Sequence, residues 1–286
     1  MTALLALMMS LVLTACATAS AANVRNAPLP APAEEPLRYV VETEVREDAE
    51  YAEDGTLLAS CRFELPVVQV LRPDGTRVET ARNGRETEAL AAREAFNRRF
   101  EDWDGEFREV AAAARERWEA QRERPDLPVW IIEYTTELAS TVYQTDRIVS
   151  VAGEYYSFTG GAHGNTCHLS WNFDLEKGEF FEPALLSEDT DLDEAVTAEL
   201  IRQANAPTES GYVPAMDYWE DYEAVMAGWS SYAVSFDAEG MTVVFSPYEL
   251  ASYAMGPQAF RISYGWLRPH LSGRGLELLG LESAAP

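Results

Sequence analysis

The three histidines of the chain are the side chains best suited to metal binding or proton transfer, and two of them lie close together. His163 belongs to the segment TGGAHGN at residues 159–165, His168 follows five positions later, and His270 is distant in sequence. A three-histidine zinc site would need all three to converge. Three glycines let the segment bend sharply, namely Gly160, Gly161 and Gly164. We therefore favour a structural role for His163, bonded to backbone groups of this loop, and predict neither a metal nor a cofactor.

Motifs of nucleophilic and metal-dependent hydrolysis are not found in the sequence. There is no G-x-S-x-G, no H-E-x-x-H, no C-x-x-C and no phosphate-binding glycine loop. The sequence leaves open whether two carboxylates are paired for glycoside cleavage, because its 48 acidic residues could form pairs anywhere in the chain. The sequence thus predicts that the protein is not an enzyme. An envelope glycan hydrolase that uses carboxylates or a histidine metal site is the alternative.

Several polar and aromatic residues near predicted strand ends are candidates for ligand contact. Tyr248 and Tyr253 belong to a wide connection, SPYELASYAMGPQAF, in which burial is the favoured role over recognition. Asp174 lies beside a predicted turn and is equally suited to shaping the end of a strand. The full set of candidate binding or structural-turn residues is Gly160, Gly161, His163, Gly164, Asn165, Asp174, Tyr248 and Tyr253.

The charge of the chain limits its partners. With 48 acidic and 22 basic residues, the net charge is -26 at neutral pH. A phosphate backbone would be repelled by such a surface, so nucleic acid is not an expected partner. A basic partner would be attracted, although solubility alone also accounts for high acidity.

The amino-terminal residues predict a lipid anchor. The segment MTALLALMMSLVLTAC is an apolar run that ends in a cysteine, as in bacterial lipoprotein signals. A spanning helix needs about 20 apolar residues, so this run is short for one. We predict a signal peptide over residues 1–15, lipidation of Cys16 and a flexible tether over residues 16–36. Because Ala17 rather than an aspartate follows Cys16, we expect the periplasmic side of the outer membrane.

The two other cysteines lie on alternating, strand-like segments. In an oxidising periplasm, Cys61 and Cys167 could form a disulfide. Two buried free thiols are the alternative, and the sequence leaves the choice open.

Hydrophobic periodicity predicts the elements that position these residues. Alternation predicts strands at 37–45, 59–71, 129–141, 146–158, 165–175, 231–238, 241–247 and 258–266. Apolar steps of three and four predict one long helix or two stacked helices over 84–123, and we favour a continuous or kinked helix. Ser187 is predicted to cap a second helix that runs to about residue 205, and a shorter aromatic helix is expected over 216–229.

This order of elements predicts an α+β fold with two lobes of antiparallel sheet and helices packed on one face. The predicted domains are residues 37–155 and residues 156–286, which divide the chain beyond the tether into two halves.

The sequence also resembles two known families. The segment YYSFTGGAHGNTCHLSWNFDLEKGE and the later EGMTVVFSPYELASYAMGPQAFRISYGWL look like the C-terminal extracellular domain of the anti-sigma factor RsiV. Residues 37–155 are similar to the companion domain first named after the peptidoglycan deacetylase PdaC. The resemblance does not imply deacetylation, since that chemistry belongs to a separate metal-dependent domain whose Asp and His signatures are absent from this sequence.

The RsiV resemblance implies a binding function. That family binds lysozyme outside the cytoplasmic membrane, and an acidic surface suits a basic partner of this kind. We therefore expect a non-catalytic envelope lipoprotein that binds an envelope macromolecule, either a lysozyme-like protein or peptidoglycan. A purely structural envelope protein is the second alternative to this function.

Overall fold

The computed structural model describes residues 36–124 and 133–282 and confirms the α+β fold class. One sheet has six strands in the order β1-β2-β3-β4-β5-β6, and a second has three in the order β7-β8-β9. The strands are β1 (Arg38–Tyr51), β2 (Leu57–Leu71), β3 (Tyr134–Gln144), β4 (Ile148–Phe158), β5 (Asn165–Asp174), β6 (Glu179–Phe180), β7 (Ala233–Phe236), β8 (Gly240–Phe245) and β9 (Gln258–Ser263). The α-helices are α1 (Gly84–Arg98), α2 (Trp103–Arg122), α3 (Leu192–Ala204), α4 (Tyr222–Ala227), α5 (Tyr264–Leu267) and α6 (Gly273–Leu278).

The six-stranded sheet is mixed, which corrects the expectation of antiparallel sheets. β2 and β3 run parallel, whereas the other neighbouring pairs are antiparallel. The physical reason is the long connection through α1 and α2, which returns the chain to the end of the sheet where β2 began. Only a crossover of this kind lets two neighbouring strands point the same way.

Residues 84–123 form two helices, α1 and α2, which was the alternative to the favoured continuous or kinked helix. The chain leaves regular α-helix at residues 99–102, and the backbone N–H groups of Arg99, Phe100 and Glu101 bond to carbonyls three residues earlier instead of four. Just before the break, the side-chain amide of Asn97 bonds to both backbone groups of Val68, at 2.8 and 3.1 Å. The apolar stripe nevertheless continues through both helices, because Phe96, Phe100 and Phe107 are all buried.

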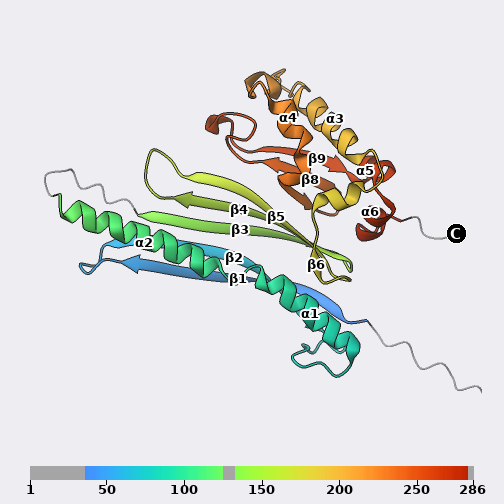
Figure 1. Cartoon of the computed structure of the whole chain (residues 1–286), viewed down its shortest axis with the longest axis horizontal. Coiled ribbons are helices and arrows are strands. Elements are labelled where there is room, and N and C mark those ends of the chain that lie inside the picture. Colours follow the sequence, from blue (N-terminus) through green and yellow to red (C-terminus); the bar gives the residue numbers. More distant parts are fainter. Residues whose placement is uncertain (1–35, 125–132, 283–286) are drawn as a thin grey trace, which may run out of the picture. The chain divides into compact units, whose positions relative to one another are not determined.

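Two apolar cores lie on opposite sides of the six-stranded sheet. In Figure 1, α1 and α2 run along one side of this sheet, while β7–β9 and the later helices lie on the other. The first core contains Phe63, Phe96 and Phe173 between α1, α2 and the sheet. The second is formed around the fully buried Trp229 and includes side chains from α3, α4 and the three-stranded sheet.

The three-stranded sheet is joined to the six-stranded one by buried polar side chains. Asn172 accepts a hydrogen bond from Ser150 Oγ at 2.7 Å and donates one to the carbonyl of Val234 in β7 at 2.8 Å. Ser150 Oγ in turn accepts from the backbone N–H of Phe236 at 2.8 Å, and Ser170 Oγ accepts from that of Val234 at 2.9 Å. These side chains of β4 and β5 therefore connect the two sheets by hydrogen bonds. We call Ser150, Ser170 and Asn172 the polar joint.

The start of α3 also differs from the prediction. Ser187 ends a short 3-10 helix, η1 (Pro183–Ser187), where its hydroxyl donates to the carbonyl of Ala184 at 2.8 Å. α3 begins only at Leu192, with Asp191 as its N-cap residue. Ser187 therefore stabilises the preceding turn instead of capping the helix.

Several predictions on chain organisation stay predictions. Residues 36–286 form one compact unit, and the predicted boundary at residues 155–156 falls within β4. The predicted signal peptide, Cys16 and nearly all of the tether lie outside the described residues. Across residues 36–124 and 133–282, no helix has both the length and the apolar character needed to cross a membrane.

Candidate functional site

The glycine-histidine segment forms the loop between β4 and β5. Gly160 adopts a φ of 96° and Gly161 a φ of 102°, which side chains other than glycine rarely tolerate. Gly164 is required for a different reason, since a Cβ there would approach the ring of Tyr156 to 2.3 Å. The loop is thus shaped by its glycines and by close packing on a strand aromatic.

The imidazole of His163 is held by three neighbours. Its Nδ1 lies 2.8 Å from the carbonyl oxygen of Gly164, so Nδ1 carries the proton and donates. Its Nε2 lies 3.4 Å from the hydroxyl of Tyr248 and is left to accept. The ring stacks on Tyr253 with a centroid separation of 3.9 Å and an angle of 15°. Three of the residues singled out in the sequence, His163, Tyr248 and Tyr253, therefore meet in space.

Tyr248 has a strained backbone and an exposed ring, so the prediction that its side chain is buried was wrong. Its φ of 74° is unusual for a residue other than glycine, and 52% of its surface is accessible. The strained loop is held by neighbours on both sides: Glu249 accepts from the backbone N–H of Ser246, and the indole N–H of Trp219 donates to the carbonyl of Tyr248 at 3.3 Å. Burial raises the pKa of the Glu249 carboxyl. Strain that persists at an exposed aromatic residue is typical of a contact site.

Exposed aromatic and apolar side chains gather around this loop. Among the described residues, four of the six exposed large hydrophobic side chains lie between residues 212 and 248, namely Tyr212, Met216, Trp219 and Tyr248. The hydroxyl of Tyr212 donates to Asp217 at 2.6 Å and lies 3.7 Å from Sδ of Met255, close in sequence to Tyr253. We call these four side chains, together with His163 and Tyr253, the aromatic face.

The surroundings of the aromatic face are strongly acidic. No Lys, Arg or His occurs between Arg202 and Arg261, whereas this stretch contains eight acidic residues. Of these, Asp217, Glu220 and Asp221 are exposed beside Trp219. The face therefore combines planar apolar contact area with the exposed carboxylates of Asp217, Glu220 and Asp221.

The other candidate residues are not part of this face. Asn165 starts β5 and its amide lies 3.5 Å from Sγ of Cys167. Asp174, at the opposite end of β5, is only 1% exposed; it accepts the N–H groups of Glu176 and Lys177 at 3.0 Å and is paired with Arg274. Its carboxylate oxygens already bond to groups of the protein, so Asp174 stabilises the turn after β5 and forms a buried ion pair.

The three histidines do not converge. His168 lies in the wall of a pocket along β5, and its pKa is lowered by burial. His270 bonds to Asp191 at 2.9 Å and packs against Trp266. In the described parts of the chain, no group of three or more His, Cys, Asp or Glu side chains is arranged to hold a metal ion.

The candidate disulfide between Cys61 and Cys167 is corrected by the structure. Both are free thiols. Cys61 lies in β2 and Cys167 in β5, with β3 and β4 between them. Three strand spacings amount to about 14 Å, whereas a disulfide needs Cα atoms within about 7 Å. Alternation in each strand could be seen in the sequence, but the order of strands in the sheet could not.

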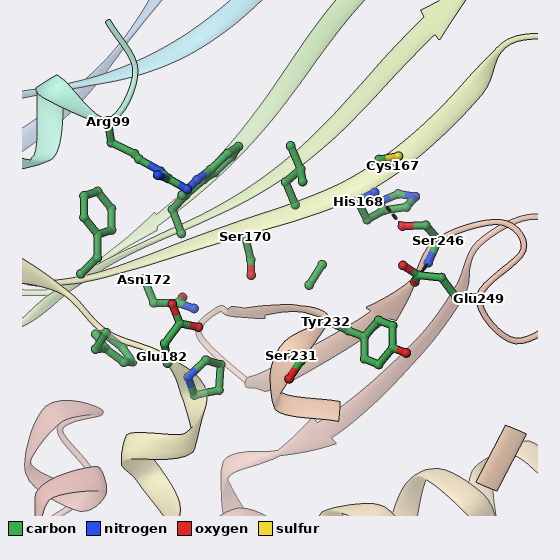
Figure 2. Close-up of a pocket in the computed structure, with 16 residues that line it drawn as sticks. Arg99, Cys167, His168, Ser170, Asn172, Glu182, Ser231, Tyr232, Ser246 and Glu249 are labelled. Carbon is green, nitrogen blue, oxygen red and sulfur yellow. Dashed lines mark hydrogen bonds between the residues drawn. The ribbon is translucent and has the colours of Figure 1, made fainter. Parts of the chain in front are cut away.

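A pocket of 580 Å³ lies along β5, where the two sheets meet. Figure 2 shows His168, Ser170 and Asn172 on the side of β5 that faces Ser231, Tyr232 and Ser246, with Arg99 on the opposite side. Ser246 accepts the backbone N–H of His168 at 2.9 Å. The sequence prediction missed these residues, because an alternating strand gives the same pattern whether its polar side meets water or a second sheet.

Two regions of the chain match known families. Residues 85–166 match the family described as "Deacetylase PdaC", and residues 180–265 match the family described as "Protein of unknown function (DUF3298)". Each match covers less than half of the chain, and together they confirm the resemblance at the level of domains. The PdaC match continues past residue 155, so it includes the glycine-histidine loop that the sequence prediction placed in the second domain.

The fold is shared with a solved structure. A DUF3298 family member from Bacteroides fragilis aligns with a TM-score of 0.58 at 14% identity, covering 86% of this chain and 98% of that one. A DUF3298 family protein from Pseudomonas aeruginosa aligns with a TM-score of 0.46 at 18% identity, covering 84% and 96%. No curated protein matches the sequence significantly.

Proposed function

We propose that this protein is a non-catalytic binding protein of the bacterial cell envelope whose aromatic face binds a basic, lysozyme-like protein. The observation that supports the proposal is the coincidence of exposed aromatic side chains, a strained Tyr248 and a long stretch without basic residues. The resemblance to the RsiV family, whose members bind lysozyme, points in the same direction.

Two properties of the aromatic face suit it to a basic protein partner. Aromatic side chains dominate binding energy at protein interfaces because they bury large, rigid surfaces. The carboxylates around them attract a basic partner and speed its association, and cations of the partner can also contact the aromatic rings. The strained loop fixes Tyr248 before binding, which lowers the entropy lost on association.

We expect Tyr248→Ala and Trp219→Ala each to weaken binding of hen-type lysozyme by about tenfold or more, the effect of an interface hot spot. Calorimetry with the Pro36–Pro286 unit would measure the dissociation constant. Tyr51→Ala is the matched control, because Tyr51 is a tyrosine of similar exposure, 54%, on β1. This variant should bind like the wild type.

Salt and a second ligand separate the alternatives. If the three variants bind equally well and affinity is lost steeply with added salt, only charge attraction is present and the aromatic face has no role. Sedimentation with purified peptidoglycan, sensitive to the same substitutions, would instead identify the glycan as the ligand. If the protein binds neither lysozyme nor peptidoglycan, a purely structural envelope protein is favoured.

The proposed location is the periplasmic side of the outer membrane, with a lipid on Cys16. Cells fed an alkyne-labelled fatty acid should incorporate the label into the wild-type protein and lose it with Cys16→Ala. Cys167→Ala, which removes a different free thiol, should keep the label. A wild-type protein that stays unlabelled and outside the membrane fraction would contradict the anchor.

A further inference from the structure

Strand β5 has one edge that is largely unpaired. Along one side it pairs with β4 over its whole length, from Asn165 to Asp174. On the other side it pairs with β6 only at Phe173 and Asp174. Within the described residues, no strand pairs with residues 165–172 on that side. Ser246 and Phe181 bond there to the N–H of His168 and the carbonyl of Asn172, so the open part of the sheet edge is the stretch around Ser170.

The backbone groups of Ser170 point outward at this edge. Two neighbours show the direction: the N–H of His168 donates to Ser246 Oγ at 2.9 Å, and the carbonyl of Asn172 accepts from the N–H of Phe181 at 2.8 Å, both away from β4. In an antiparallel pair, every second residue turns both backbone groups toward the same side. Ser170, midway between them, therefore presents its N–H and its carbonyl to the open edge.

Two pockets meet at this edge from opposite faces of the sheet. The 580 Å³ pocket contains His168, Tyr232 and Glu249 on the side of the three-stranded sheet. A second pocket of 380 Å³ contains Trp103 and Glu106 on the side of α2. Both are lined by the same four residues, Arg99, Leu169, Ser170 and Trp171.

This arrangement fits an added strand. Successive side chains of a strand point to opposite faces of a sheet, so a peptide paired with Ser170 would place one side chain in each pocket in turn. Its backbone would supply the bonds that the edge lacks. Pairing by strand addition gives affinity through the main chain and specificity through such alternate pockets.

The lining of the two pockets favours a basic peptide. Four carboxylates, from Asp102, Glu106, Glu182 and Glu249, face a single guanidinium, that of Arg99. The hydroxyl of Tyr155 donates to Glu106 at 2.7 Å and so fixes one of these carboxylates. A lysine could lay its apolar stem over Trp103 while its ammonium group reaches Glu106.

We infer that the open edge of β5 takes up an extended, basic segment of a partner protein by strand addition. The inference deepens the proposed function, on whose basic partner it rests, by naming the form in which part of that partner is bound. The larger pocket lies next to the aromatic face in the sequence, because Tyr248 of that face stands between Ser246 and Glu249, which line the pocket. One partner could therefore contact both.

The test uses a fluorescent eight-residue probe with the repeat Lys-Val-Lys-Thr and capped ends, titrated with the Pro36–Pro286 unit. We expect binding of this peptide and none of the matched peptide with Glu in place of Lys. Methylating all internal backbone nitrogens of the lysine peptide keeps its charge but removes its N–H donors. This analogue should bind at least about tenfold more weakly, the effect of losing one or two hydrogen bonds.

A pair of variants tests the protein side. Ser170→Pro removes the outward N–H, whereas Ser170→Ala loses the same hydroxyl bond to Val234 but keeps that N–H. We expect Ser170→Ala to bind the peptide like the wild type and Ser170→Pro to bind it at least about tenfold more weakly. If Ser170→Pro does not fold, the comparison of methylated and unmethylated peptide with the wild-type protein still tests strand addition.

The inference would be overturned by equal binding of the methylated and unmethylated peptides, or by no binding of the lysine peptide at low salt. Lysozyme binding is measured separately, so the two proposals can fail independently. Lysozyme binding that depends on Trp219 and Tyr248, without peptide binding, would leave the proposed function intact and remove strand addition. Peptide binding without lysozyme binding would support strand addition and contradict the proposed binding of a lysozyme-like protein.

Discussion

An Asp174→Ala variant is expected to lose about 3 kcal/mol of the free energy of unfolding, because the change leaves the charge of Arg274 without its buried partner. The carboxyl of Asp174 is almost completely buried and is paired with Arg274, whose side chain is 20% exposed. It also accepts two backbone N–H groups of the turn that follows β5. We choose the lower end of the range for buried pairs, since Arg274 keeps a second contact with Glu277 at 2.8 Å.

Urea unfolding of the Pro36–Pro286 unit would measure this loss. The control is Glu176→Ala, because Glu176 also lies near Arg274, at 4.0 Å, but is 77% exposed. That change should alter the free energy of unfolding by less than about 0.5 kcal/mol. An Asp174→Asn variant keeps an acceptor for the turn and should fall between the two. Equal stability of Asp174→Ala and Glu176→Ala would contradict the buried ion pair.

The second large effect is expected for Asn172→Ala, which should lower the free energy of unfolding by about 2–3 kcal/mol through unsatisfied buried groups. The substitution removes the acceptor of the Ser150 hydroxyl and the donor to the carbonyl of Val234. Neither neighbour is exposed enough for water to replace the lost bond fully, since Ser150 is 1% exposed and Val234 is fully buried.

Unfolding of Asn172→Ala, Ser150→Ala and the double variant gives the coupling between the two side chains. A coupling of about 1 kcal/mol or more is expected for a buried hydrogen bond. Hydrogen exchange should also become faster in β7, which loses one of its two hydrogen bonds to side chains of β5. The exposed Asn205 on the other side of the second core is the control. If Asn172→Ala matches Asn205→Ala, the polar joint does not hold the sheets together.

Much of the fold could be predicted from periodicity. The alternation that predicts strands and the steps of three and four that predict helices depend on neighbours along the chain, and most described strands and helices lie near the predicted ranges. The short elements β6, α5 and α6 were not predicted, and α5 begins within the predicted strand 258–266. The first residues of the predicted strand 129–141 lie outside the described part of the chain. The break between α1 and α2 could not be predicted in the same way. Just before the break, Asn97 bonds to Val68, a residue of a distant strand, and periodicity along the chain does not show such a contact.

The candidate site was predicted only in part. His163, Tyr248 and Tyr253 stood out by residue type, and they do come together. Trp219 did not, because it falls in a predicted helical segment, where an aromatic residue is more often buried than exposed. Tyr212 lies between the predicted helices and was not singled out. The absence of basic residues between Arg202 and Arg261 was visible in the sequence and would have directed attention to this region.

The sequence by itself determined the α+β class, the acidity, the bends of the glycine-histidine loop and the alternation of β5, because each depends on residue type or on short-range spacing. The tertiary structure decided that the second, polar face of β5 is also covered, which edge is open and which loops meet. These depend on strand order and on the packing of one sheet against the other, which involve residues far apart in the chain. Thus the same alternating segment, residues 165–174, supplies a core, a polar joint and an open edge, and only its neighbours assign the three roles.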